Sequence, residues 1–251
     1  INSFLCVGID ISTDSLGSDN LENLISHSKK VVDATKDIAL AYKPNFAFFE
    51  KWGSKGFEWL EEMMGYIGDG PITIADAKRG DIGNTAKQYA ASIFGHFDFD
   101  SVTLSPYMGE DSIMPFLNNE EKGVFILCRT SNPSAKTFQS LNVYNEVKLY
   151  EQVAKWADSL NVNDNVGLVV GATAPEKLIK VRRLAPSLPI LIPGIGAQGG
   201  DLVSCIKKGN KSGIGILNIS RDISFSGSHS ANDIRQSAKM YVKKMNEALN
   251  V

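Results

Sequence analysis

The sequence predicts an α/β fold, a (β/α)8 TIM barrel that forms one domain over residues 1–251. Eight short apolar segments alternate along the chain with longer amphipathic stretches, which is the order of elements that such a barrel requires. The apolar segments are nearly continuous, as in parallel strands that are covered on both faces. No linker, composition shift or low-complexity tract marks a second domain, and a doubly wound sheet seldom uses eight such units in this length.

The expected strands are short apolar runs rich in branched and aromatic residues. They cover 4–10, 41–49, a run that begins at 72, 101–105, 123–128, 166–170, 189–193 and 213–218. The expected helices have apolar residues at helical spacing. They cover 21–40, 56–67, 85–94, 145–160, 175–184, 201–208 and 231–249.

Composition excludes several classes of function. The formal net charge of −2 leaves no basic excess to neutralise phosphates, so we expect no nucleic-acid partner. No apolar run approaches the roughly 20 residues that cross a membrane, and no signal-like segment opens the sequence, so we expect no membrane partner. Cys6 and Cys128 lie in apolar runs, and with Cys205 they are expected as buried thiols rather than a disulfide framework. We expect a cytoplasmic protein.

In such a barrel the functional site lies at the carboxyl ends of the strands. Polar residues occur there in most units of the chain. They are Asp10 after the first strand, Lys43 and Asn45 in the second, Asp76 and Lys78 at the third, Thr130 and Ser131 after the fifth, Gln198 after the seventh, and Ser220 with Arg221 after the eighth. We therefore expect these side chains to meet at one mouth of the barrel.

The densest cluster of charges is at 76–81, where Asp76, Lys78 and Asp81 follow an apolar run. In a strand Asp76 and Lys78 point the same way, and charges at such a place are costly unless they are paired. With Lys43 across the mouth, an alternating Lys-Asp-Lys-Asp chain becomes possible. The structural alternative is an ion pair of Asp76 with Lys78, a helix N-cap at Asp81 and a surface lysine at 43.

The glycine-rich stretch 193–201 follows the seventh strand, and its exposed backbone N–H groups suit a phosphate. Arg221, after the eighth strand, strengthens this interpretation because the last two strands of such barrels commonly build a phosphate site. The alternatives are a flexible loop with Asp201 as a helix N-cap, and a rim salt bridge for Arg221.

After the fifth strand, Thr130 and Ser131 place two hydroxyls where they could read the edge of a planar polar ligand. Ordinary turn chemistry at Ser-Asn-Pro is nearly as good an explanation. The polar tract 132–139 is a candidate lid or a plain surface loop. His27, His96 and His229 have no ligand-like spacing, so we expect no metal site.

Four motifs together resemble the orotidine 5′-phosphate decarboxylase family. They are Asp-x-Lys-x-x-Asp-Ile-Gly-Asn-Thr at 76–85, Lys-Pro-Asn-Phe-Ala-Phe at 43–48, Pro-Gly-Ile-Gly-Ala-Gln at 193–198, and Arg221 after the last strand. The likeness is greatest to the subfamily with the Asp-Ile-Gly-Asn-Thr continuation, and it runs from Cys6 to about Ile223.

The resemblance implies cofactor-free decarboxylation of orotidine 5′-monophosphate to UMP, the last step of de novo pyrimidine nucleotide synthesis, by a homodimer. By similarity, the catalytic residues are Lys43, Asp76 and Lys78 of one subunit, with Asp81 reaching into the neighbouring site together with Ile82 and Thr85. The implied substrate contacts within one subunit are Asp10, Asn45, Thr130, Ser131, Pro193, Gln198, Ser220 and Arg221, of which Thr130 and Ser131 read the pyrimidine. Many members carry Gly where this chain has Ser220, which puts the backbone grip on phosphate in question.

The mechanism expected from this resemblance needs a positive charge where a carbanion develops at C6 of the base. Lys78 is the candidate for that charge and for the acid that protonates C6. A Mg²⁺-dependent 3-keto-gulonate-6-phosphate-type decarboxylase is one rival. It would need an acidic metal ligand near the second strand, where this chain has Lys43. A catalytically silent nucleotide-binding barrel is the other, and the intact Lys78 argues against it.

Overall fold

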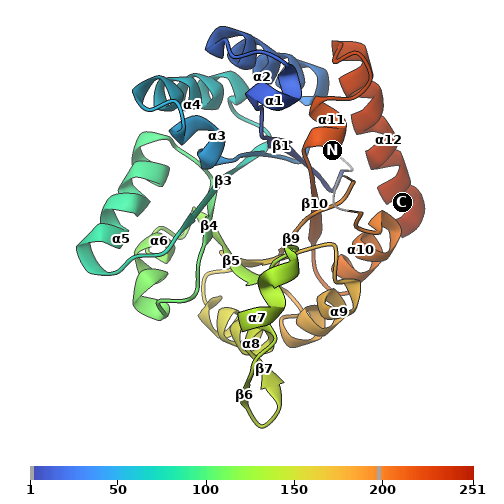
Figure 1. Ribbon diagram of the computed structural model, residues 1–251. Helices are drawn as coiled ribbons and strands as arrows, with labels where there is room; N and C mark the ends of the chain where they lie inside the picture. Colours follow the sequence, from blue (N-terminus) through green and yellow to red (C-terminus); the bar gives the residue numbers. More distant parts are fainter. Residues whose placement is uncertain (1–2, 197–198) are drawn as a thin grey trace.

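The computed structural model describes residues 3–196 and 199–251, and at its centre eight parallel strands close into a barrel (Figure 1). Hydrogen-bonded neighbours follow the order β1-β10-β9-β8-β5-β4-β3-β2, and β2 pairs with β1 to complete the ring. The strands are β1 (Leu5–Ile9), β2 (Ala41–Pro44), β3 (Ile72–Arg79), β4 (Ser101–Leu104), β5 (Gly123–Arg129), β8 (Val166–Val170), β9 (Ile190–Pro193) and β10 (Gly215–Ile219). The predicted barrel and its eight strands are confirmed.

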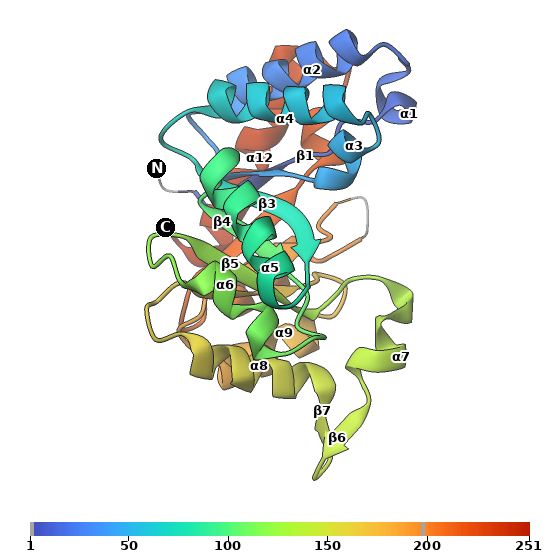
Figure 2. The ribbon, with the colours of Figure 1, turned by 90° about the vertical axis from the view of Figure 1, so that its left-hand side faces the viewer.

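Helices surround the barrel, as Figures 1 and 2 show from two sides. The longer ones are α2 (Leu21–Thr35), α4 (Ser54–Ile67), α5 (Gly83–Ala90) with its π-helical continuation η1 (Ala91–His96), α8 (Leu149–Leu160), α9 (Pro175–Leu184), α10 (Leu202–Gly209) and α12 (Ala231–Leu249). The short ones are α1 (Thr13–Leu16), α3 (Phe46–Glu50), η2 (Glu110–Ser112), α6 (Met114–Leu117), η3 (Pro133–Ala135), α7 (Lys136–Gln139) and α11 (Arg221–Ser224). The predicted bounds of α9 and α12 are confirmed to the residue.

Side-chain caps set where several of these helices begin. Asn20 accepts a hydrogen bond from the backbone N–H of Glu22 at the start of α2, and Ser230 does the same for Asp233 in α12. Asp201 accepts from the N–H of Ser204 at the start of α10, so the N-cap alternative raised for Asp201 is confirmed.

The expectation of a strand over 41–49 is wrong in its second half. Asn45 keeps an extended backbone and bridges to Asp76, but its side chain caps α3, accepting a hydrogen bond from the N–H of Ala47. The aromatic residues that suggest a strand instead form one face of a helical turn, with Phe46 and Phe49 buried. The local pattern of a short apolar run does not distinguish these outcomes, and the cap decides between them.

A second difference concerns residues 142–148, where the helix expected from 145 begins only at Leu149. The segment forms a hairpin of β6 (Asn142–Tyr144) and β7 (Val147–Lys148), which stands out from the ring of helices together with α7 (Figure 2). Asn145 and Glu146 both have positive φ, +44° and +62°, as a tight two-residue hairpin turn requires.

The barrel interior is closed by one layer of side chains from seven strands. These are Cys6, Ala41, Ile74, Phe125, Val169, Leu191 and Ile216, all at most 8% exposed. A second, larger apolar layer lies between the strands and the helices. The cysteines are free and buried, as predicted. Among the residues with described structure, no helix has the length and apolarity to traverse a bilayer.

Candidate active site

A cavity of about 450 Å³ lies at the carboxyl-terminal mouth of the barrel. Ten of the residues expected at the site line it, namely Asp10, Lys43, Asn45, Asp76, Lys78, Thr130, Ser131, Pro193, Ser220 and Arg221. Because they come from six different strands or the loops that follow them, only closure of the barrel brings them together. Gln198 lies outside the described residues.

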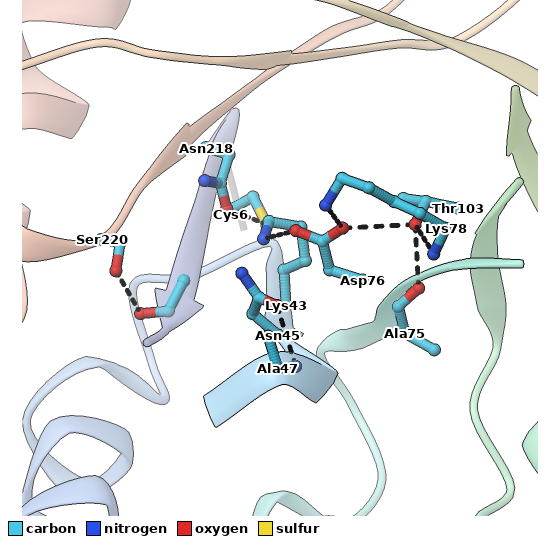
Figure 3. A network of polar contacts seen from close by, with 11 residues as sticks. Cys6, Lys43, Asn45, Ala47, Ala75, Asp76, Lys78, Thr103, Asn218 and Ser220 are labelled. Atoms are coloured by element: carbon cyan, nitrogen blue, oxygen red, sulfur yellow. Dashed lines mark hydrogen bonds and ion pairs between the residues drawn. The ribbon is translucent and has the colours of Figure 1, made fainter. Parts of the chain in front are cut away.

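Three charged side chains form a row in this cavity (Figure 3). Lys43 Nζ and Lys78 Nζ each lie 2.5 Å from an oxygen of Asp76, Oδ2 and Oδ1 respectively. The side chains of Lys43 and Asp76 are 4% and 11% exposed, whereas that of Lys78 is 50% exposed. The row therefore leads from the protein interior to the open part of the cavity, and its outer end is an ammonium group.

The row keeps its buried members ionised. Burial by itself lowers the pKa of Lys43, but the nearby charges of Asp76 and Asp10 outweigh it and raise that pKa above its ordinary value. Burial raises the pKa of Asp76, yet the charges of Lys43 and Lys78 hold it well below the usual range for a carboxyl. Asp76 is thus a fixed anion between two cations at neutral pH.

The loop after β5 is braced by Gln139 of α7. Gln139 Oε1 accepts from the backbone N–H of Thr130 at 2.9 Å, and Gln139 Nε2 donates to Thr130 Oγ1 at 2.8 Å. Thr130 Oγ1 in turn donates to Asn132 Oδ1 at 2.6 Å. The tract 132–139, expected as a lid or loop, is therefore tied to Thr130 at both ends, and Ser131 is held between Thr130 and the cavity-lining Asn132.

The loops after β9 and β10 carry the groups expected to hold a phosphate. Gly194 and Gly196 have φ of +100° and +79°, and a Cβ on Gly196 would lie 2.2 Å from Asp222 Oδ2, so this loop needs glycine. Ser220 Oγ donates to the carbonyl oxygen of Gly8 at 3.2 Å, and a Cβ on Gly8 would lie 2.7 Å from Ser220 Cβ. The departure at Ser220 is thus accommodated by a glycine on β1.

Asp10 follows β1 and Asn45 follows β2, and both line the cavity. Asp10 Oδ1 is buried and has no hydrogen-bond partner among the described residues. An unpaired buried carboxylate oxygen is costly, and a ligand hydroxyl would satisfy it. Asn45 uses its Oδ1 to cap α3 while its side chain lines the cavity.

Asp81, Ile82 and Thr85 do not line the cavity of their own chain. The N-cap of α5 is Ile82, with no side-chain cap bond, and Asp81 Oδ1 accepts from the adjacent N–H of Ile82 at 2.8 Å. The structural alternative of Asp81 as the helix N-cap is therefore wrong. Ile82 is 50% exposed and Thr85 is exposed, so both are available to a second chain.

Nine other residues line the cavity. Gly194 and Ile195 belong to the glycine-rich stretch expected to hold a phosphate, and Asn132 begins the candidate lid. Sequence reasoning gave no role to the other six, Thr103, Leu127, Val169, Leu191, Asn218 and Asp222. Asn218 carried a usable signal, since it is a polar residue inside an otherwise apolar strand. The apolar members carried none, because Val169 and Leu191 also belong to the interior layer of the barrel.

Among the described residues, no group of three or more His, Cys, Asp or Glu side chains has the arrangement of a metal site. The cavity instead holds its own organic cations, Lys43, Lys78 and Arg221. Fold and cavity together define a barrel enzyme whose charged groups act at the carboxyl ends of the strands.

Comparison with known proteins narrows this class. The model of the orotidine 5′-phosphate decarboxylase / HUMPS family matches residues 3–236. The orotidine 5′-phosphate decarboxylase of Natronomonas pharaonis is 46% identical over 236 residues, which cover 92% of this chain and 87% of the relative. Solved structures of similar fold point to the same family. The Leishmania donovani OMP decarboxylase has a TM-score of 0.89 at 38% identity, covering 100% of this chain and 95% of that one. The L. donovani UMP synthase has a TM-score of 0.91 at 41% identity, covering 98% of this chain but 54% of that one.

The chain belongs to the orotidine 5′-phosphate decarboxylase / HUMPS family, and it is an enzyme of the carboxy-lyase class. The family resemblance inferred from the four motifs is confirmed.

Proposed function

We propose that this chain converts orotidine 5′-monophosphate to UMP and CO2, within pyrimidine nucleotide synthesis. The observation that carries the proposal is the row Lys43–Asp76–Lys78, which ends in an ammonium group inside the cavity. The family match and the names of the relatives support the same substrate.

In the proposed step, the bond between C6 of the pyrimidine and its carboxylate carbon breaks, CO2 leaves, and the electron pair stays on C6. The ammonium of Lys78 stabilises this pair and delivers a proton to C6, and the amine then regains a proton from water. Asp76 fixes where the ammonium of Lys78 stands, while Lys43 fixes Asp76.

Other walls of the cavity fit the remaining parts of the nucleotide. Within the described residues the guanidinium of Arg221 makes no ion pair, so its planar fork is available to the 5′-phosphate beside the loop of Gly194 and Gly196. Gln198 completes this phosphate site in the proposal, together with Pro193 and Ser220. The unpaired oxygen of Asp10 would accept from a ribose hydroxyl, with Asn45 beside it. Thr130 and Ser131 read the pyrimidine edge.

We further propose a homodimer with shared sites, in which Asp81, Ile82 and Thr85 complete the neighbouring cavity. Two observations support it. These three residues follow β3 directly but lie outside their own cavity. Large apolar side chains on the loop after β4, the strand next to β3, are exposed, including Tyr107 at 90% and Met108 at 49%, and a second copy would cover them. The proposal predicts that mixing Asp81→Asn protein with Lys78→Ala protein restores activity. No recovery despite demonstrated subunit exchange would contradict shared sites.

The direct test is the fall in absorbance of orotidine 5′-monophosphate as UMP forms, measured with and without a chelator. We expect turnover that the chelator leaves unchanged, because the proposed step draws its positive charge from Lys78 alone. A metal-dependent sugar-phosphate decarboxylase would lose activity with chelator. A silent nucleotide-binding barrel would bind UMP without any turnover. The cytoplasmic location and the single domain over 1–251 stay predictions.

A further inference from the structure

Strand β3 is bulged at the place where it carries the charged row. Ala75 pairs with Val102 and Arg79 pairs with Leu104, so β3 advances four residues while β4 advances two. The ladder resumes immediately afterwards, where the N–H of Ser105 donates to the carbonyl of Arg79 at 2.7 Å. Three residues, 76–78, therefore lie opposite the single residue Thr103, and bulges redirect side chains next to active sites.

Within the bulge Lys78 has a left-handed backbone, with φ of +45°. This conformation is uncommon for a residue with a side chain, and it persists only where surrounding contacts hold it. It also turns Lys78 out of the regular alternation of a strand. The contact of the Lys78 ammonium with Asp76 thus depends on the groups that hold the Lys78 backbone in this conformation.

One side chain on the partner strand makes the required contacts. Thr103 lies between Val102 and Leu104, opposite the bulge, and is 2% exposed. Its Oγ1 accepts from the backbone N–H of Lys78 at 3.0 Å, which replaces the ladder partner that the bulge removes. The same hydroxyl donates towards Asp76 Oδ1 at 3.2 Å, with the carbonyl of Ala75 at 3.4 Å as its second acceptor (Figure 3).

We propose that Thr103 is a positioning residue that sets the place of the Lys78 ammonium by bridging the Lys78 backbone and the Asp76 carboxylate. One hydroxyl contacts both the backbone of the cation and the anion that the cation meets, so it sets the two relative to each other. The inference deepens the proposed function and rests on it, since it concerns the same reaction and the same lysine.

The chain offers a closely matched control on the same two strands. Thr73 is 5% exposed at the other end of β3, and its Oγ1 also bridges a backbone N–H and a carboxylate, here those of Asp100 at 3.0 and 2.8 Å. Thr73→Val and Thr103→Val make the same chemical change in the same strand pair. Only the second touches the bulge.

The experiment measures kcat and KM for orotidine 5′-monophosphate, and the dissociation constant of UMP, in Thr103→Val, Thr103→Ser and Thr73→Val. Because misplacement of a reacting group by about 1 Å can cost on the order of a hundredfold, we expect kcat of Thr103→Val to fall by about tenfold to a hundredfold. KM and UMP binding should change by less than about threefold, since Lys78 acts mainly on developing charge. Thr103→Ser should restore most of kcat, and Thr73→Val should keep it. Thr103→Ala replaces Thr103→Val if that protein does not fold.

Three kinetic outcomes would overturn the inference. They are a wild-type kcat in Thr103→Val, an equal loss in Thr73→Val, or no rescue by Thr103→Ser. A crystal structure of Thr103→Val adds a test that does not depend on activity, because Lys78 should leave its left-handed conformation or its contact with Asp76. An unchanged Lys78 overturns the inference. If the wild-type protein does not decarboxylate the substrate, the proposed function fails by itself, and the Lys78 geometry in the variant still decides the role of Thr103.

Discussion

Replacing Lys78 by alanine should separate stability from activity. The Lys78 side chain is half exposed, and Asp76 keeps its buried contact with Lys43 after the change. An ion pair with one partly exposed member contributes little to folding, so the free energy of unfolding should fall by less than about 1 kcal/mol. The thermal and denaturant unfolding curves should therefore nearly overlay those of the wild-type protein.

The expected loss of activity is much larger. Two unit charges about 4 Å apart interact by about 4 kcal/mol at an effective dielectric of about 20, which suits a half-exposed group better than the value for a dry interior. In the proposed mechanism Lys78 faces this charge only when the C6 carbanion develops, so the energy is expressed in the barrier. Removal of at least ~4 kcal/mol lowers kcat by about three powers of ten.

The assay compares kcat for orotidine 5′-monophosphate with unfolding curves of the same preparations. Lys29→Ala is the matched control, because Lys29 Nζ also lies 2.5 Å from a carboxylate, that of Glu62, but remote from the cavity. It should show a similarly small change in stability and normal turnover. Turnover of Lys78→Ala within tenfold of wild type would refute the role assigned to Lys78.

Three further predictions concern other parts of the chain. Arg221→Ala should weaken UMP binding at least about tenfold while leaving uridine binding unchanged, because a charged hydrogen bond to phosphate is lost. Equal losses of affinity for both ligands, measured by calorimetry, would contradict the phosphate role. Gln139→Met keeps the length of the side chain but removes both hydrogen bonds to Thr130. Binding of UMP should therefore weaken by about tenfold, whereas binding of ribose 5-phosphate should not change. A parallel loss of ribose 5-phosphate binding would point to general disorder instead. His27 is 3% exposed, its Nε2 lies 2.7 Å from the carbonyl oxygen of Ser224, and burial lowers its pKa. Its contribution to stability is therefore present above its unfolded pKa of about 6.5 and is lost as pH falls further, so thermal unfolding of His27→Gln should vary less than wild type between about pH 7 and 5.

The barrel could be predicted from the sequence because its strands are buried on both faces. A run such as 166–170 has no polar face, and the structure places all five of its residues in the interior. The long amphipathic helices could be predicted equally well, as the bounds of α12 show. Where a short element carries a cap, as at Asn45, the apolar run alone predicted the wrong element. A single side-chain hydrogen bond decided between strand and helix there.

The residues of the charged row could also be predicted from the sequence, since Asp76 and Lys78 lie together at the end of an apolar run. The geometry of the row could not be predicted. Regular alternation places the two side chains on one face, but the bulge and the left-handed Lys78 depend on Thr103 of the next strand. The bond from Gln139 to Thr130 spans nine positions that contain only a loop and two short helical turns, and it left no periodic signal in the sequence.

The location of the row on two adjacent strands has an energetic consequence. Lys43 and Asp76 are removed from water when the barrel folds, so their orientation costs nothing further at the moment of reaction. That arrangement ties the site to the stability of the fold. Asp76→Asn would leave the ammonium of Lys43 buried beside a neutral amide, and breaking a buried pair in this way costs about 3–5 kcal/mol. On the proposed mechanism we therefore expect loss of Asp76 to weaken folding and catalysis together and loss of Lys78 to affect catalysis alone, because the fold has buried the anion but left its outer cation at the surface of the cavity.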